Sequence, residues 1–218
     1  MTMKYGIVGS SGRMGLEIAK AFDGAGHERV LTSDLAGTEC RAKPEVIADF
    51  SSHSALAGTI ELCRKHGAAL VVGTTALQEE HFAQLRSLGR EAAVVQSFNF
   101  ATGVNVLKMI LRDYAPLLSD WDLEVSETHH NKKKDAPSGT AILLRDATGR
   151  NCPTHSLRLG GVPGDHSVTF ANDGEVLTFT HRALARNVFA IGALRAAVFA
   201  ATAKPGLYTF EDVLKNRT

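Results

Sequence analysis

The sequence predicts an α/β protein of two domains, the first built on a parallel sheet and the second on a mixed or antiparallel sheet. Short apolar strands alternate with helical stretches up to residue 100, and a glycine-rich turn joins the first strand to the first helix. Longer segments that alternate apolar and polar residues follow. We expect the first domain at residues 1–100 and the second at residues 101–186, with the C-terminal segment 187–218 packed back on the first.

The first strand, at residues 3–8, runs directly into the turn Gly9-Ser-Ser-Gly-Arg-Met-Gly15 and then into a helix. In such units the glycines permit a tight turn, let backbone amides approach a pyrophosphate and let the helix pack on the strand. The spacing here is Gly-x-x-Gly-x-x-Gly, which differs from the usual Gly-x-Gly-x-x-Gly. Because strand, turn and helix follow in the required order, we predict a Rossmann-like domain that binds a dinucleotide.

The second strand, at residues 30–32, is followed by Asp34, about twenty residues beyond the turn. A carboxylate at this place accepts hydrogen bonds from both ribose hydroxyls and repels a 2′-phosphate. The residue therefore favours NADH over NADPH, and an ordinary turn aspartate is the alternative interpretation. Arg13 and Arg41 can still neutralise a 2′-phosphate, so the use of both nucleotides stays open.

The rest of the first domain keeps the alternation that is typical of a parallel sheet with crossover helices. We predict strands at residues 46–50, 69–72 and 93–97, with helices at 55–66 and 79–88. Ligands of open parallel sheets lie beyond the carboxyl ends of the strands. The predicted cofactor-binding residues belong to the glycine turn and to three strand ends: Gly9, Ser10, Ser11, Gly12, Arg13, Met14, Asp34, Gly73, Thr74, Thr75, Ser97, Phe98, Asn99 and Phe100.

The second domain is predicted to begin with a helix at residues 102–118. Four segments of alternating apolar and polar residues come next, at 121–128, 156–159, 167–171 and 175–181. Alternation of this kind is typical of half-buried strands, which predicts a second, mixed or antiparallel sheet. A final apolar helix at 188–203 precedes a short apolar ending.

The segment 127–140 gathers two histidines, three lysines and a helix start. His129 and His130 end the predicted strand, and Ser138 is a candidate N-cap for a helix that ends near Thr148. Amides at a helix start bind carboxylate or phosphate groups, and a nearby lysine strengthens that binding. A lysine run alone is usually a solvated loop, but acid, cation and amide donors together predict a site for an anionic substrate.

Composition sets further bounds. With 44% hydrophobic residues and a net charge of +1, a nucleic-acid partner is not expected. No apolar run is long enough to span a bilayer and no signal peptide is visible, so we expect no membrane partner and a cytoplasmic location. Cys40, Cys63 and Cys152 lie far apart, which predicts reduced thiols, and the 9 histidines lack the spacing of metal ligands, so no metal is expected.

The chain resembles the family of dihydrodipicolinate reductases, also called 4-hydroxy-tetrahydrodipicolinate reductases, of bacterial lysine and diaminopimelate synthesis. The resemblance spans the whole chain. Its most specific part is Glu127-Thr-His-His-Asn-Lys-Lys-Lys-Asp-Ala-Pro-Ser-Gly-Thr-Ala141, which is similar to the family signature Glu-x-His-His-x-x-Lys-x-Asp-x-Pro-Ser-Gly-Thr-Ala. Supporting matches are Gly9-x-x-Gly-Arg-Met-Gly15, Gly73-Thr-Thr75, Asn99-Phe-x-x-Gly-Val-Asn105 and His181-Arg-Ala-x-x-Arg186. The chain is shorter than many members, chiefly after Asp34.

The resemblance implies that His129 donates or accepts the proton and that Lys133 is a second donor. The substrate-binding residues that it implies are His130, Gly139, Thr140 and Arg186. The family reaction delivers a hydride from NADH or NADPH to an unsaturated cyclic imine dicarboxylate, with loss of the 4-hydroxyl group as water. Members are commonly homotetramers assembled through the sheet of the second domain.

Two alternatives stay open from the residues. Another nicotinamide-dependent dehydrogenase of a carboxylate substrate, such as an aspartate dehydrogenase-like protein, would share the glycine turn without requiring the His-His-x-x-Lys spacing. A regulatory protein that senses the NADH to NAD ratio would also bind nucleotide, but it would need no proton donor. Both bind NADH, so turnover is what distinguishes them from the reductase.

Overall fold

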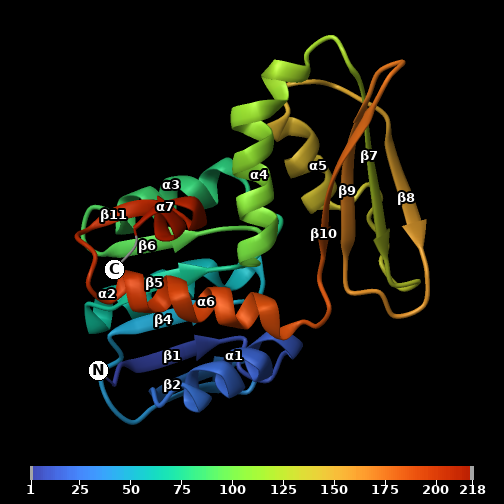
Figure 1. Cartoon of the computed structure of the whole chain (residues 1–218). Coiled ribbons are helices and arrows are strands. Elements are labelled where there is room, and N and C mark those ends of the chain that lie inside the picture. Colours follow the sequence, from blue (N-terminus) through green and yellow to red (C-terminus); the bar gives the residue numbers. More distant parts are fainter. Residues whose placement is uncertain (1, 217–218) are drawn as a thin grey trace. The chain divides into compact units, whose positions relative to one another are not determined.

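The computed structural model describes residues 2–216, and the chain divides into two compact units. One unit contains the residues up to Phe100 together with those from Asn187 onward, and the other is Ala101–Arg186 (Figure 1). The predicted fold class, a mostly parallel sheet with helices plus a second mixed sheet, is confirmed. In the part of the chain that the structure describes, no helix is both long and apolar enough to cross a membrane.

The sheet of the first unit has the strand order β11-β6-β5-β4-β1-β2-β3. Every pairing is parallel except that of β3 with β2. The strand bounds are β1 Lys4–Val8, β2 Glu28–Asp34, β3 Gly37–Cys40, β4 Val46–Asp49, β5 Ala69–Val72, β6 Ala93–Gln96 and β11 Gly206–Thr209. All residues of β4 and β5 are buried, because both faces of the sheet are covered.

One face of this sheet packs against α1 (Arg13–Gly24), α6 (Asn187–Ala200) and α7 (Phe210–Lys215). The helix α6 approaches closely because its buried positions are alanine and glycine. A Cβ added at Gly192 would overlap the carbonyl oxygen of Phe100, so a larger residue there would push α6 away. The opposite face packs against α2 (Leu56–His66), which follows a short 3-10 turn, and against α3 (Glu79–Leu88).

Two strands of this sheet, β3 and β11, were not predicted from the sequence. The residues of β3 are exposed throughout, so no apolar alternation marks them, and the strand follows β2 as a short hairpin. The strand β11 alternates between half-buried and exposed positions over only 4 residues. It pairs with β6 at the edge of the sheet, directly before the capping box of Thr209 and Asp212 that begins α7.

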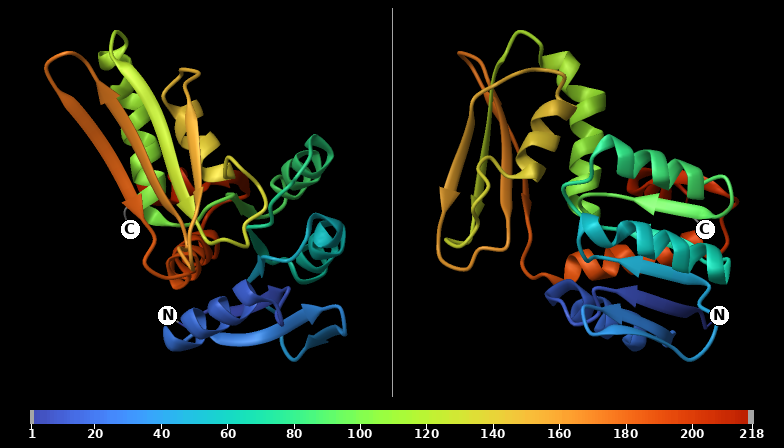
Figure 2. Two further views of the ribbon diagram at one scale, coloured as in Figure 1. Left: turned by 90° about the vertical axis from the view of Figure 1, so that its right-hand side faces the viewer. Right: turned by 180° about the vertical axis from the view of Figure 1, so that it is seen from behind.

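The second unit contains a four-stranded sheet of order β10-β9-β7-β8. Its strands are β7 Asp122–His129, β8 Thr154–Arg158, β9 Asp165–Ala171 and β10 Val176–Arg182. β9 runs antiparallel to both neighbours, whereas β7 and β8 are parallel, so the sheet is mixed. The helices α4 (Thr102–Tyr114) and α5 (Gly139–Ala147) lie on one of its faces, as both views of Figure 2 show.

The inward face of this second sheet changes character along its length. Leu123 and Val125 of β7 are buried toward the helices, and Val168 and Phe170 of β9 lie beside them. The same alternation continues to the carboxyl end of β7, where the buried side chains are polar. The register that aligns the apolar residues therefore also aligns the polar ones, which build the candidate site.

Candidate active site

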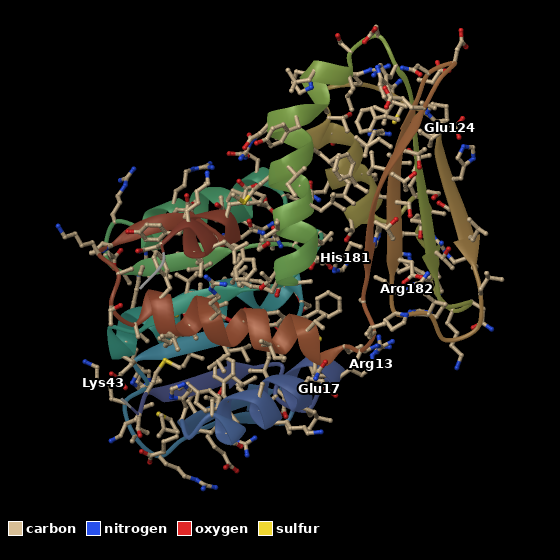
Figure 3. The ribbon with its side chains drawn as sticks, in the orientation of Figure 1. Arg13, Glu17, Lys43, Glu124, His181 and Arg182 are labelled. Carbon is tan, nitrogen blue, oxygen red and sulfur yellow. The ribbon has the colours of Figure 1, made fainter. Side chains whose placement is uncertain are left out.

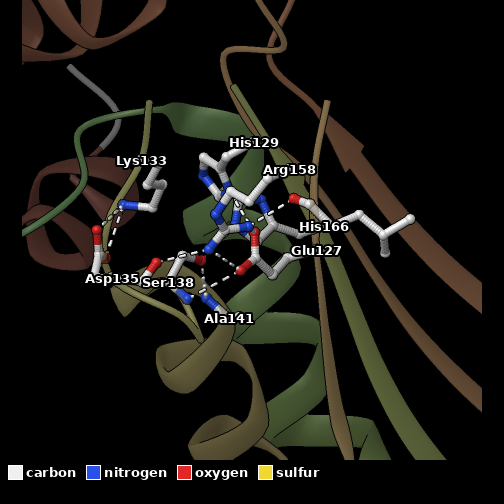
Figure 4. A network of polar contacts seen from close by, with 9 residues as sticks. Glu127, His129, Lys133, Asp135, Ser138, Ala141, Arg158 and His166 are labelled. Carbon is white, nitrogen blue, oxygen red and sulfur yellow. Dashed lines mark hydrogen bonds and ion pairs between the residues drawn. The ribbon is translucent and has the colours of Figure 1, made fainter. Parts of the chain in front are cut away.

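The strand register brings polar side chains from three strands to one end of the inward face. Glu127 of β7 lies opposite His166 of β9, and His129 of β7 lies opposite Arg158 of β8. Glu127, His129 and His166 are buried, with exposed fractions of 1%, 8% and 4%. Figure 4 shows these side chains converging above the start of α5.

Glu127 is the centre of this cluster. Its Oε1 accepts hydrogen bonds from Arg158 Nη2 at 2.9 Å and from the backbone N–H of Ser138 at 3.2 Å. Its Oε2 accepts one from Arg158 Nη1 at 3.0 Å and a short one from His129 Nδ1. Burial raises the pKa of Glu127, but the hydrogen bonds from Arg158, Ser156 and His129 outweigh it and bring the pKa to about 2.

His166 lies beside His129, with ring centroids 5.1 Å apart and an edge-on arrangement. Its Nε2 contacts the hydroxyl of Ser138 at 3.2 Å. Burial and the neighbouring His129 lower the pKa of His166 to about 3, so the ring is neutral near pH 7. His166 therefore adds a polar but uncharged wall to the cluster.

The start of α5 has the predicted cap. The hydroxyl of Ser138 accepts the backbone N–H of Ala141 at 3.1 Å, and α5 begins at Gly139 as expected. Gly139 is exposed at the helix start, and Thr140 is half-buried. Because Ser138 also contacts Glu127 and His166, the helix start is tied to the polar cluster of the sheet.

The predicted second donor, Lys133, lies in the loop between β7 and α5. Its Nζ donates to both carboxylate oxygens of Asp135, at 2.8 Å each. Burial raises the pKa of Asp135, but the hydrogen bond and charge of Lys133 lower it further, so the net shift is downward. His130 begins the loop, and its carbonyl accepts the backbone N–H of Lys133 at 3.1 Å.

Arg186 follows β10, outside the three strands that carry this cluster. It is exposed, in the turn directly before α6, and its side chain makes no hydrogen bond or ion pair with any of residues 2–216. Figure 3 labels His181 and Arg182 near the end of β10, five and four positions earlier in the chain than Arg186. The role of Arg186 in substrate binding stays a prediction.

The glycine turn of the first unit has the geometry that its spacing predicts. Gly9 has a φ of +80°, which favours glycine, and β1 ends immediately before it. A Cβ at Gly15 would overlap the carbonyl oxygen of Gly9, so the helix could not pack this closely with any other residue. Gly12 is the N-cap of α1, and having no side chain it leaves the first amides of the helix uncapped.

Around this turn, Ser10, Ser11 and Arg13 are solvent-accessible, while Met14 packs partly against the core. Figure 3 shows Arg13 at the start of α1, by the carboxyl ends of the strands, and Lys43 near their amino ends. Helix-start amides, small side chains and a cation at one strand end can hold a pyrophosphate. The turn therefore fits a dinucleotide.

Asp34 ends β2 next to the glycine turn. Its carboxylate accepts the backbone N–H of Ala36 at 2.8 Å and the hydroxyl of Ser10 at 3.2 Å. The backbone hydrogen bond from Ala36 is the main cause that lowers the pKa of Asp34, followed by the hydroxyl of Ser11. An ionised carboxylate is thus held beside the turn.

The other predicted cofactor residues differ in orientation. Thr74 is buried and its hydroxyl donates to Asp49 at 3.2 Å, while Gly73 has no room for a side chain beside the ring of Phe50. Thr75 is exposed. Only the backbone of Thr74 can face a nucleotide, because its side chain points into the unit.

The end of β6 behaves similarly. The hydroxyl of Ser97 donates to the carbonyl of Asn99 at 2.7 Å, and Phe98 is 48% exposed with its ring edge-on to Phe82. The ring of Phe100 is buried between Phe50 and Phe210. Phe98 is thus the accessible aromatic side chain of this strand end, whereas Phe100 packs in the core.

The remaining candidate groups are the three cysteines and the possible metal ligands. Cys40, Cys63 and Cys152 are free thiols, and burial raises the pKa of Cys63. Among residues 2–216, no group of three or more histidine, cysteine, aspartate and glutamate side chains is arranged to hold a metal ion.

Sequence reasoning assigned no role to Glu127, Arg158 or His166. Glu127 carried a usable signal, because it lies two residues before His129 and therefore on the same face of β7. Arg158 and His166 reach the site only through the register of β8 and β9 on β7, which one sequence does not reveal.

Comparison with known proteins identifies the family. Residues 22–100 match the family described as "Dihydrodipicolinate reductase, N-terminus", and residues 103–214 match "Dihydrodipicolinate reductase, C-terminus". A 4-hydroxy-tetrahydrodipicolinate reductase of Thermosipho africanus is 50% identical over 213 residues, which cover 98% of each chain. The chain belongs to the dihydrodipicolinate reductase family.

Other members of this family are also similar. A 4-hydroxy-tetrahydrodipicolinate reductase of Methanocorpusculum labreanum is 38% identical, over 97% of this chain and 99% of the relative. A solved dihydrodipicolinate reductase of a Paenisporosarcina species, bound to dipicolinate, has a TM-score of 0.82 at 22% identity and covers 97% of this chain and 99% of its own. The predicted family and the predicted nicotinamide-dependent oxidoreductase are therefore confirmed.

An aspartate dehydrogenase of Thermotoga maritima resembles the reductase fold less closely. Its TM-score is 0.52 at 12% identity, with 94% of this chain and 98% of that chain covered. At that identity the likeness shows the fold alone, so it gives no support to an aspartate dehydrogenase activity.

Proposed function

We propose that this protein reduces 4-hydroxy-tetrahydrodipicolinate to tetrahydrodipicolinate, with His129 as the proton donor and the start of α5 as the place that binds a substrate carboxylate. The observation that carries the proposal is the buried pair of His129 and Glu127 tied through Ser138 to that helix start. Proton transfer and anion binding are thus built into one rigid cluster, as reduction of a dicarboxylate requires.

The substrate is bound by the second unit in this proposal. The amides of Gly139 and Thr140 would donate to one carboxylate, since helix starts favour anions. His130 and Lys133 would contact the other, and Arg186 is a further candidate. To reach a carboxylate, Lys133 would exchange the carboxylate of Asp135 for that of the substrate.

The cofactor is bound by the first unit. A nicotinamide nucleotide supplies the hydride when bound. The room kept by Gly12 and Gly15 and the accessible Ser10, Ser11 and Arg13 support pyrophosphate binding at the start of α1. The ionised Asp34 supports NADH as the preferred nucleotide, because it would accept ribose hydroxyls and repel a 2′-phosphate.

His129 would hold a proton on Nε2 and deliver it to the ring carbon next to the carbon that receives the hydride. General acid catalysis of this kind contributes about two to four orders of magnitude in rate. The buried surroundings of His129 support this role, because they keep water from competing for the proton.

We also propose a homotetramer assembled through the face of the second sheet that lies opposite α4 and α5. That face carries hydroxyl side chains that bond across strands, with Ser167 and Thr180 at 3.0 Å and Thr169 and Thr178 at 3.2 Å. Closed homo-oligomers bury the same surface patch on each subunit, and this exposed sheet face offers such a patch. Light scattering on the purified protein measures its mass and so tests the homotetramer. A cytoplasmic location stays a prediction.

The decisive experiment measures oxidation of NADH and of NADPH by the purified protein, supplied with substrate made in situ by a coupled dihydrodipicolinate synthase. His129→Ala and Lys133→Ala should lose most of the activity. Lys132→Ala and Lys134→Ala are matched controls, because these lysines flank Lys133 in the same loop and are exposed. Absence of oxidation above the substrate-free rate, with nucleotide still bound, would refute the proposal.

A further inference from the structure

We propose that Glu127 is the positioning residue of the site: its carboxylate orients His129 for proton transfer and fixes the start of α5 where the substrate carboxylate binds. The inference rests on the proposed function, which assigns those two roles. It adds a named carboxylate, and the arginine that holds it, to the machinery of the reaction.

Both oxygens of the Glu127 carboxylate accept two hydrogen bonds each. Arg158 contacts both of its oxygens as a fork, at 2.9 Å and 3.0 Å, which is the strongest arrangement of an arginine and a carboxylate. Each oxygen then has one further donor, His129 Nδ1 on Oε2 and the Ser138 amide on Oε1. With its side chain fully buried, Glu127 has little freedom to rotate away from either partner.

Glu127 also determines which nitrogen of the His129 imidazole carries the hydrogen. Glu127 is ionised well below neutral pH, so it can only accept hydrogen bonds. The Nδ1 of His129 must therefore carry a hydrogen, and in the neutral ring Nε2 is left as the atom that gains and loses the proton. A carboxylate that holds Nδ1–H in this way also stabilises the imidazolium.

Gly164 lies beside Nε2 of His129. A Cβ added at Gly164 would lie 3.0 Å from His129 Nε2, and this glycine directly precedes β9. A side chain at that position would press on the nitrogen that exchanges the proton. Gly164 thus keeps space beside Nε2, while Glu127 holds the opposite side of the ring.

Glu127 is also linked, through Ser138, to the start of α5. The carboxylate of Glu127 connects the strand that carries the acid with the residue that caps α5, because Oε1 accepts the Ser138 N–H and Ser138 Oγ accepts the Ala141 N–H. Loss of the carboxylate would release the proton donor and the anion-binding amides together. A residue with a purely structural role would not affect the tautomer of His129.

The test uses Glu127→Gln alone and combined with Arg158→Met. The single variant leaves a largely buried Arg158 without its anion, which destabilises strongly, so the double variant removes both charges and preserves the fold. Glu91→Gln is the matched control, because Glu91 and Arg64 form an exposed pair at 3.1 Å in the first unit, away from the proposed site and from the proposed subunit interface.

Two measurements are made on each folded variant. Steady-state assays should show kcat reduced about a hundredfold in the double variant, with a higher KM for the dicarboxylate and an unchanged KM for NADH. Nitrogen-15 NMR of the imidazoles should show neutral His129 with its hydrogen on Nδ1 in the wild type and with a large Nε2–H population in the double variant. Glu91→Gln should match the wild type in both.

A double variant that keeps wild-type kcat and KM, or that keeps the Nδ1–H tautomer of His129, would overturn the inference while the reductase activity of the wild type still stands. If the wild type itself reduces no substrate, the proposed function fails. The NMR measurement then decides alone whether Glu127 orients His129.

Discussion

Lys133 and Asp135 form an ion pair in which one ammonium group contacts both carboxylate oxygens at 2.8 Å. The lysine side chain is 22% exposed and that of the aspartate 60% exposed, so the pair is open to solvent. Exposed pairs of this kind contribute about 0–1 kcal/mol. A substrate carboxylate can therefore displace Asp135 from Lys133 with little loss of free energy.

The first prediction concerns this exchange. Asp135→Asn should lower KM for the dicarboxylate by up to about fivefold, because Lys133 no longer has an intramolecular anion to leave. Steady-state kinetics at saturating NADH measures the change. The gain should vanish when Lys133→Ala is added, and a raised KM in Asp135→Asn alone would show that Asp135 instead holds Lys133 in its working position.

A second prediction follows from the low pKa of Glu127. Its pKa of about 2 lies below the ordinary glutamate value of 4.5, so the folded state binds this proton less readily than the unfolded state. The resulting stability is fully present above about pH 4.5 and is lost as the pH falls through about 2; it amounts to about 3 kcal/mol. Denaturant unfolding from pH 7 to pH 2 should show this fall in the wild type and a weaker one in Glu127→Gln with Arg158→Met.

His166 gives a third prediction, in a higher pH window. Its pKa is lowered from 6.5 to about 3, mainly by burial, so protonation favours the unfolded state. Stability from this group is present above about pH 6.5 and falls as the pH drops toward 3. His166→Gln should remove the part of the acid sensitivity that lies above about pH 4.5, where Glu127 does not yet titrate. An unchanged profile between pH 6.5 and 4.5 would argue against a buried neutral ring.

The fourth prediction tests the glycine turn. In Gly15→Ala the added Cβ would overlap the carbonyl oxygens of Gly9 and Ser10, so the turn must open. NADH binding, measured by fluorescence titration, should weaken more than about tenfold, which corresponds to about 1.4 kcal/mol. Gly24→Ala is the matched control, because Gly24 lies at the other end of α1 with nothing within 4 Å of an added Cβ.

Nucleotide choice gives the fifth prediction. Asp34→Ser removes the charge that would repel a 2′-phosphate but keeps a hydrogen-bonding side chain beside Ser10. The ratio of kcat/KM for NADPH to that for NADH should rise about tenfold, the effect of roughly 1.4 kcal/mol. An unchanged ratio would assign nucleotide choice to other groups, of which Arg13 and Arg41 are the candidates.

Much of the architecture could be predicted from the sequence. The helix Glu79–Leu88 and the strand Ala69–Val72 have the expected bounds, because apolar periodicity and the turns around them mark both ends. The exposed β3 could not be found in this way, since none of its residues is buried. The edge strand β11 is similarly short and poor in buried residues.

Some residues of the candidate site could likewise be predicted from the sequence, and others could not. His129 and the cap at Ser138 could be predicted because they lie in one continuous segment. His129 ends a strand and Ser138 begins a helix, and these positions indicate their roles. Arg158 and His166 come from strands that the chain reaches only 29 and 37 residues after His129. Pairing between distant strands is set by the packing of whole faces, and that information is not local.

The helix α6 covers one face of the first sheet, and β11 completes that sheet at its edge, although both follow the second unit in the chain. During synthesis the strands before Phe100 therefore leave the ribosome without the helix that buries Tyr5, Ile7 and Val71. The second unit has all of its strands and helices in one continuous stretch and can fold first. Assembly of the nucleotide-binding half is thereby postponed until the last segment of the chain has emerged.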